Sequence, residues 1–189
     1  ENLTMHTTRT RHRTPTTRVL AAVSALAAVV LMGCTPQTPP EAGTVTCRSA
    51  SGQMSITPGV VLDARSNRFT LTGPSPTTSC VDRTGAGVTS ARAADLSILF
   101  PSLGCVVPEG TSGDGTATVR WSDGSTSSLE LVATLDSAYG GDITSTITSG
   151  RFAGGTASAR FLATPTEGSC LEDGIPAESV ELGNIIVRP

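Results

Sequence analysis

The clearest chemistry in this sequence of 189 residues is offered by its five cysteines, Cys34, Cys47, Cys80, Cys105 and Cys170. The last four are separated by 33, 25 and 65 residues, whereas a zinc site needs cysteine or histidine ligands in close pairs. Both histidines precede Cys34, so the rest of the sequence offers no imidazole ligand. An even number of cysteines in an exported domain predicts disulfides, here two. Three pairings are possible, and we favour Cys47–Cys80 with Cys105–Cys170, which places one bridge in each half.

Export itself is predicted by residues 1–33. Four arginines precede an apolar run over residues 19–31, and the small residue Gly33 follows that run closely. A basic start, a short apolar core and a small residue before the cut are typical of a secretory signal peptide. The run is too short for a permanent span, because a hydrocarbon core of ~30 Å takes about 20 helical residues. Met5 is the expected initiator, and residues 1–4 are expected to be an upstream extension.

The end of this leader, Leu31-Met32-Gly33-Cys34, resembles the lipobox of bacterial lipoproteins. The resemblance implies cleavage after Gly33 and a diacylglycerol thioether on Cys34, with acyl chains such as palmitate. Two acyl chains suffice for stable anchoring to a membrane. We therefore expect a lipid-anchored, extracytoplasmic protein on the outer face of the cytoplasmic membrane. The alternative is an ordinary signal peptide with a chance cysteine.

The residues after Cys34 divide into a short tether and one domain. Residues 34–44 hold three prolines and no large apolar side chain, which is typical of an extended spacer. Residues 45–189 are about the length of a single domain.

Within that domain the apolar residues alternate with polar ones at the period of a β-strand. Residues 117–121 and 128–135 alternate on either side of Asp123-Gly124, which predicts a hairpin with a type I′ turn. Residues 88–100 fit either a helical turn or a strand, and nearby glycine and proline favour the strand. Gly183-Asn184 predicts a bulge in the last strand. We expect an all-β fold, an antiparallel β-sandwich (immunoglobulin-like or a partly closed barrel) with two disulfides.

Part of this domain resembles uncharacterised exported proteins of actinobacteria. The resemblance is carried by residues 115–127, by the turn at 150–154 and by the late Cys170. It implies a lineage for the chain, and it brings no activity with it.

Composition excludes several function classes. Without histidine or lysine after Cys34, Ser-His-Asp, Cys-His and Ser-Lys arrangements are impossible there. That segment also carries 9 of the 13 arginines and 15 of the 16 acidic residues, a net charge of −6. Because phosphate binding needs clustered cations, we expect no nucleic-acid partner.

Carboxylates are the remaining candidates for catalysis or for metal binding. A glycosidase needs two carboxyl groups at a fixed separation, usually beside aromatic rings that stack on sugar. With one Trp, one Tyr and four Phe, the chain has few such rings. The carboxylate pairs considered are Asp114 with Asp123, Asp136 with Asp142, and Glu172 with Asp173. We interpret these acids as turn residues or solvated charges.

One loop, residues 136–142, deserves separate mention because two carboxylates, Asp136 and Asp142, flank glycines and Tyr139. Calcium accepts such oxygen ligands, yet the loop matches no defined calcium motif, and an ordinary turn is preferred. We expect no metal and no cofactor. Tyr139, with Asp136 and Asp142, is the candidate contact surface, whereas Trp121 is expected in the core.

The function expected from these features is a non-enzymatic structural or binding module of the cell envelope. Its partners are expected to be the membrane, through the N-terminal lipid, and an envelope protein. The alternative is an envelope hydrolase that uses paired carboxylates. A solute-binding lipoprotein that feeds a transporter is a third hypothesis, although those proteins usually have two α/β lobes.

Overall fold

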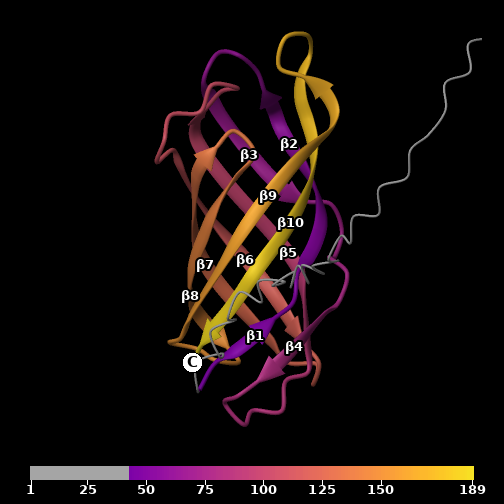
Figure 1. Ribbon diagram of the computed structural model, residues 1–189, viewed down its shortest axis with the longest axis vertical. Coiled ribbons are helices and arrows are strands. Elements are labelled where there is room, and N and C mark those ends of the chain that lie inside the picture. Colours follow the sequence, from indigo (N-terminus) through magenta and orange to yellow (C-terminus); the bar gives the residue numbers. More distant parts are fainter. Residues whose placement is uncertain (1–42) are drawn as a thin grey trace, which may run out of the picture. The chain divides into compact units, whose positions relative to one another are not determined.

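The computed structural model describes residues 43–189, which form a single antiparallel sheet of ten strands (Figure 1). The predicted signal peptide, Cys34 and residues 34–42 of the predicted tether lie outside the described residues. No helix in residues 43–189 could cross a membrane. The strands are β1 (Val45–Cys47), β2 (Ala50–Val60), β3 (Arg65–Leu71), β4 (Thr78–Asp82), β5 (Ser90–Leu103), β6 (Ser112–Trp121), β7 (Thr126–Ser137), β8 (Gly140–Gly150), β9 (Thr156–Ser169) and β10 (Gly174–Arg188).

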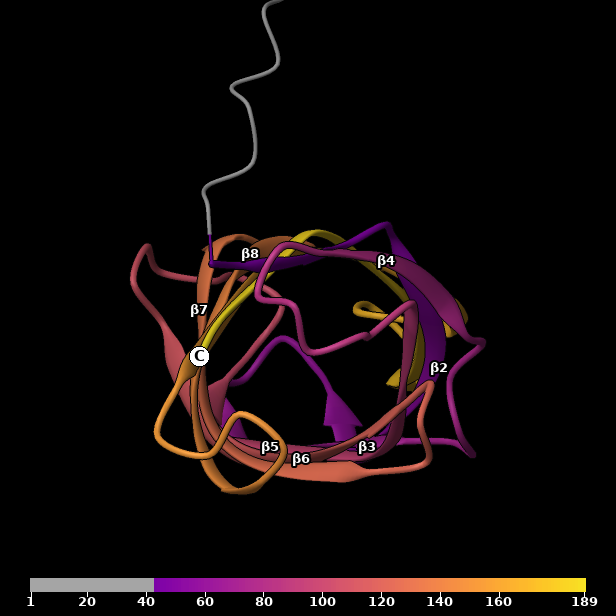
Figure 2. The same cartoon turned by 90° about the horizontal axis from the view of Figure 1, so that it is seen from below.

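The sheet closes on itself into a barrel. Its strand order runs β5-β3-β2-β10-β9-β8-β7-β6, and a further pairing of β5 with β6 joins the two ends of that order. At the other end of the molecule, β1 and β4 take the place of β2 and β3 between β10 and β5. The ring therefore has eight strands at either level, and Figure 2 shows them enclosing a central space.

The all-β class, the antiparallel pairing and both disulfides of the preferred pairing are confirmed. Of the two architectures expected from the sequence, the barrel matches the observed sheet. A two-layer immunoglobulin-like sandwich does not, because the pairing of β5 with β6 joins the strands into one ring. Closure satisfies the backbone donors and acceptors that an open sheet would leave at its edges.

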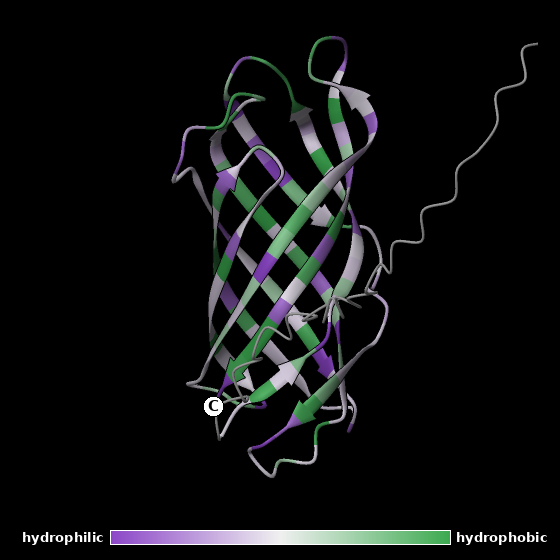
Figure 3. Ribbon diagram, in the orientation of Figure 1, coloured by the Kyte–Doolittle hydropathy of each residue, from purple (hydrophilic) through white to green (hydrophobic). Residues whose placement is uncertain are grey.

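Side-chain alternation directs each strand's apolar residues toward the barrel interior. Along β7, Leu129, Leu131, Ala133 and Leu135 are buried while the residues between them are exposed, and Figure 3 shows the same alternation on other strands. The ambiguous stretch 88–100 contributes most of strand β5, as favoured. The predicted bulge at Gly183-Asn184 is confirmed by a break in register before Ile186 and by a positive φ at Asn184.

The hairpin at Asp123-Gly124 is confirmed, but its predicted type I′ turn is wrong. A type I′ turn needs positive φ at both central residues, and only Gly124, at 82°, has it. The Gly124 N–H donates to the Trp121 carbonyl at 3.0 Å, as in a type I turn followed by a left-handed glycine. The Asp123 carboxylate accepts from the N–H and hydroxyl of Ser125, at 3.0 and 2.6 Å, and so holds Asp123 out of the left-handed region.

Because neighbouring strands alternate in direction, the links fall into two groups at opposite ends of the barrel (Figure 1). We call one end the loop end; it comprises the links 61–64, 104–111, 138–139 and 170–173. We call the opposite end the terminal end, since β1 begins there and β10 finishes there. Cys47–Cys80 joins β1 to β4 near the terminal end, and Cys105–Cys170 joins two links at the loop end.

We expect the double variant Cys105→Ser/Cys170→Ser to lose about 4 kcal/mol of unfolding free energy in urea titrations, because this bridge closes a loop of 65 residues in the unfolded chain. Removal of Cys47–Cys80, which closes 33 residues, should cost slightly less. Unfolding of either variant at the same urea concentration as the wild-type chain would contradict this account.

Candidate functional site

The barrel interior holds two clusters of buried apolar side chains and a cavity. One cluster, around Phe100 and Ile175, lies toward the loop end, and the other, around Trp121 and Ile147, lies toward the terminal end. Residues of both clusters line the cavity, whose volume is about 210 Å³. This exceeds the ~150 Å³ of an apolar protein cavity that binds benzene. The barrel can therefore hold a small guest molecule.

Small side chains at inward positions create this space. Ala117 on β6 and Ala157, Ala159 and Ala163 on β9 line the cavity. In an eight-stranded barrel the interior is just wide enough to be filled by side chains or to hold one small ligand. Because alanine is smaller than leucine or phenylalanine, alanines at these positions leave room for a small ligand. The surrounding wall is almost wholly apolar, with Val180 among the residues that face the space.

One carboxyl group, that of Glu178 on β10, interrupts the apolar wall. Glu178 lies opposite the buried Met54 of β2 and beside Pro165 of β9, and its exposed fraction is 6%. Among the residues that the structure describes, it has no hydrogen-bond or ion-pair partner. Burial raises the pKa of this carboxyl from 4.5 to about 7. Glu178 is thus part protonated and part ionised near neutral pH.

Sequence reasoning did not single out Glu178, although a signal was present. Glu178, Val180 and Leu182 follow one another at the period of a strand, which places the acid on the apolar face. The neighbouring Ser179 and Glu181 gave the segment a polar composition that concealed this alternation.

Of the three carboxylate pairs considered from sequence, Asp114 with Asp123 is separated in space. Asp114 lies near the start of β6 and Asp123 just beyond its end, which places their backbones roughly 30 Å apart at ~3.3 Å per residue. Glu172 and Asp173 are adjacent in the exposed β9–β10 link. Within the described residues that line the cavity, Glu178 is the single acidic one.

Asp136 and Asp142 do come together, but an arginine lies against both. Arg160 on β9 forms an ion pair with Asp136 and donates to Asp142 at 3.5 Å. The hydrogen bond from Arg160 is the main cause of the lowered pKa of Asp136. Among residues 43–189, no three acidic, histidine or cysteine side chains are grouped so as to hold a metal ion.

Tyr139 occupies the short link between β7 and β8, and it is 46% exposed. It also lines the cavity, together with the disulfide cysteines Cys105 and Cys170. The candidate contact residue therefore stands where the cavity approaches the loop end. Its role in binding remains a prediction.

A buried polar network closes the terminal end. The Trp121 indole N–H donates to the Ser127 hydroxyl at 2.8 Å, and that hydroxyl donates to the Arg151 carbonyl. The Trp121 ring meets Phe152 edge to face, with centroids 5.2 Å apart. As expected, Trp121 belongs to the core, at 5% exposure.

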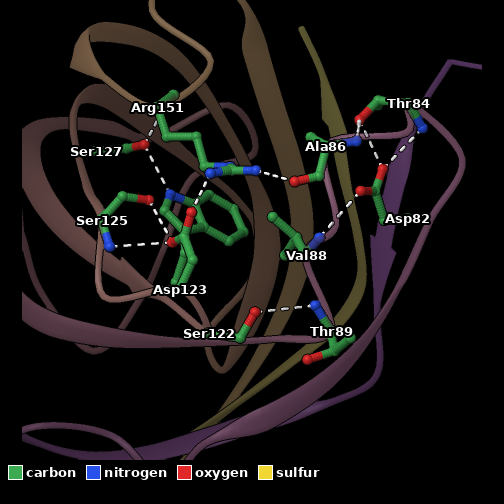
Figure 4. Close-up of polar contacts among 11 residues, drawn as sticks. Asp82, Thr84, Ala86, Val88, Thr89, Ser122, Asp123, Ser125, Ser127 and Arg151 are labelled. Carbon is green, nitrogen blue, oxygen red and sulfur yellow. Dashed lines mark hydrogen bonds and ion pairs between the residues drawn. The ribbon is translucent and has the colours of Figure 1, made fainter.

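The same network ties three links together at the terminal end (Figure 4). The Arg151 guanidinium pairs with Asp123 of the β6–β7 link and donates to the Ala86 carbonyl of the β4–β5 link. It also lies 5.3 Å from the centre of the Phe152 ring, a cation–π contact. Packed aromatic rings and cross-linked backbone thus occupy this end of the barrel.

Asp82 organises the β4–β5 link. Its carboxylate accepts from the N–H and hydroxyl of Thr84, at 2.7 and 2.6 Å, and from the Val88 N–H at 3.0 Å (Figure 4). Desolvation raises the pKa of Asp82, but these hydrogen bonds outweigh it and hold the pKa at about 2. Asp82 therefore remains an ionised acceptor that fixes Val88 against the terminal-end cluster.

Comparison of the chain with protein families, with curated proteins and with solved structures gave no match. A function has to be inferred from the barrel itself.

We expect Ser127→Ala to lose about 1–3 kcal/mol of unfolding free energy, because it removes a hydroxyl that satisfies both the Trp121 indole and the Arg151 carbonyl. Ser128→Ala, on the exposed face of the same strand, is the matched control and should change little. Urea unfolding followed by Trp121 fluorescence measures both. Equal stability of the two variants would contradict the role given to Ser127.

Glu178 should make the fold more stable in acid than in alkali. The pKa of Glu178 is about 7 in the folded protein and 4.5 in the unfolded chain, so the folded state holds the proton more tightly. The free energy of unfolding therefore falls as the pH rises from about 4.5 to about 7. The loss amounts to about 3 kcal/mol. Asp82 acts in a separate window below pH 4, where its protonation removes stability as pH falls toward 2.

The variant Glu178→Gln should abolish this slope and exceed the wild-type chain in stability at pH 8. Glu181→Gln, on the outward face of β10, should retain the wild-type slope. Urea titrations at pH 5 and pH 8 give the comparison. A wild-type slope in Glu178→Gln would show that another group titrates.

Proposed function

We propose that the chain is a lipid-anchored protein of the cell envelope whose barrel is a non-enzymatic binding module for a small apolar molecule. The observation that carries the proposal is the hollow, apolar interior of an otherwise well-packed barrel. Small-molecule sites are typically concave and mostly apolar, with a few polar groups that orient the ligand. Glu178 and Tyr139 are those groups here.

The ligand enters at the loop end. Trp121, Phe152 and the Arg151 contacts occupy the terminal end, whereas Tyr139, with nearly half its surface exposed, borders the cavity at the other. β1 begins at the opposite, terminal end. An envelope partner that delivers or collects the ligand would approach the loop end.

Two disulfides support an extracytoplasmic location, because such bridges persist in oxidising compartments. The Leu31–Cys34 sequence supports attachment through lipid on Cys34 to the outer face of the cytoplasmic membrane. Together they describe a module held at the membrane surface, where apolar molecules partition.

We expect the full chain carrying Cys34→Ser, which lacks the lipid acceptor, to bind one molecule of the neutral apolar dye Nile red per barrel, with a rise in fluorescence. Ala159→Phe fills the cavity from β9 and should weaken dye binding at least tenfold. Thr146→Phe, on the outward face of the neighbouring β8, is the control and should bind normally. Equal binding by the two variants would place the dye outside the barrel.

Anchoring is tested separately by labelled palmitate. The wild-type chain, expressed in a bacterium that processes lipoproteins, should incorporate label and sediment with membranes. The Cys34→Ser chain should incorporate none. Unlabelled wild-type protein that is released entirely into the medium would overturn the anchor while leaving the binding proposal intact.

A further inference from the structure

We infer that the ligand is a cationic amphiphile: a small apolar molecule with an amine that pairs with the Glu178 carboxylate inside the barrel. The inference rests on the proposed function, because it assigns the ligand class of the same cavity. It begins from Glu178, an acid that is 6% exposed, faces an apolar cavity and has no partner in the described part of the chain.

A buried carboxyl without a partner is costly, since it has lost water and gained no hydrogen bond. When ionised it can only accept hydrogen bonds. An ammonium group supplies donors and opposite charge together, in the short charge-assisted contact that is the stronger kind. Folding has already removed most of the Glu178 side chain from solvent, which leaves the desolvation of the amine as the larger cost of binding.

The surroundings of Glu178 leave its charge uncompensated. The residues opposite it on the two neighbouring strands are Met54 of β2 and Pro165 of β9. The other titratable side chains among the described residues that line the cavity are Arg92 of β5 and Tyr139. Burial alone accounts for the raised pKa of Glu178, with no contribution from a charged neighbour. The carboxyl is therefore free to respond to a cation that enters.

The loop end has the charge and polarity that such a ligand requires. Its four links contain four exposed carboxylates, Asp63, Glu109, Glu172 and Asp173. Arg65, the first residue of β3, is the nearby cation, and its guanidinium donates to the Gly59 carbonyl. A rim with an excess of acidic groups raises the local concentration of cationic ligands. At the terminal end, the links 83–89 and 151–155 each carry an arginine, and the link 122–125 carries Asp123, which pairs with Arg151.

Each loop-end link also presents one large apolar side chain to solvent. These are Leu62, Val106, Tyr139 and Leu171, at 54%, 77%, 46% and 81% exposure. The loop-end links thus carry both apolar and acidic groups, which match the two parts of a cationic amphiphile. The rim and the buried Glu178 carboxyl thus each favour a cationic amphiphile as the ligand.

Three probes with the same eight-carbon chain test the head group: octylamine, octanol and octanoate. Each is titrated at pH 7 against the full chain carrying Cys34→Ser with Nile red bound, and displacement gives its affinity. We expect octylamine to bind at least tenfold tighter than octanol, and octanoate to bind more weakly than octanol. In Glu178→Gln the octylamine preference should fall below threefold, while octanol affinity, which reports an intact cavity, should stay within threefold of wild type.

Glu181→Gln is the matched control, because it removes a carboxyl from the outward face of the same strand. It should keep the full amine preference. A preference that survives in Glu178→Gln, or wild-type binding that is equal for all three probes or strongest for octanoate, would overturn the inference and leave the apolar binding function standing. Failure of both Nile red and all three probes to bind would overturn the proposed function itself.

Proton release gives a second readout. When an ammonium ion pairs with Glu178, the carboxyl gives its proton to solvent as the ion pair forms. With a pKa of about 7 the group is part protonated at pH 7, so a fraction of a proton should leave per octylamine bound. Calorimetry in phosphate and in Tris buffer measures this number. Octanol, and octylamine with Glu178→Gln, should release none; equal release by Glu178→Gln would assign the proton to another group.

Discussion

The pairing of β5 with β6 is the constraint on which the rest of the structure depends. It joins the two ends of a strand order that would otherwise be an open sheet, and so gives the chain an inside. Once the ring is closed, every second side chain along each strand points into the barrel interior. The size of those side chains then decides how much of that interior is filled.

Side chains fill the barrel interior unevenly. Aromatic rings concentrate at the two ends, where Phe69 meets Phe100 and Trp121 meets Phe152 edge to face. Alanines line the cavity, three of them on β9. The aromatic contacts and the two disulfides hold the barrel together, while the alanines leave space inside it. The Glu178 carboxyl faces that space without a hydrogen-bond or ion-pair partner among the described residues.

Much of this fold could be predicted from the sequence, because strand alternation and cysteine counting are local signals. The face of each β7 residue and the hairpin at Asp123-Gly124 followed from residue type and spacing. The number of disulfides followed from the cysteine count, and the observed pairing is the favoured one of three that the sequence left possible. Closure could not be predicted, since a period of two says which way a side chain points and nothing about which strand lies beside it. Glu178 was missed for a related reason: an acid beside serine and alanine resembles a solvated residue until its apolar neighbours across the barrel are known.

The pairing of β1 with β10 also has a consequence for how the chain folds. Val45 lies opposite Val187, so the first and last strands of the described structure are partners across nearly its whole sequence length. A chain that emerges N-terminus first must hold β1 without that partner until β10 arrives. Such non-local pairing makes folding slow and leaves strand edges unprotected in the meantime. The barrel therefore depends on its final residues to complete the ring, and C-terminal truncation would remove a structural strand and not a dispensable tail.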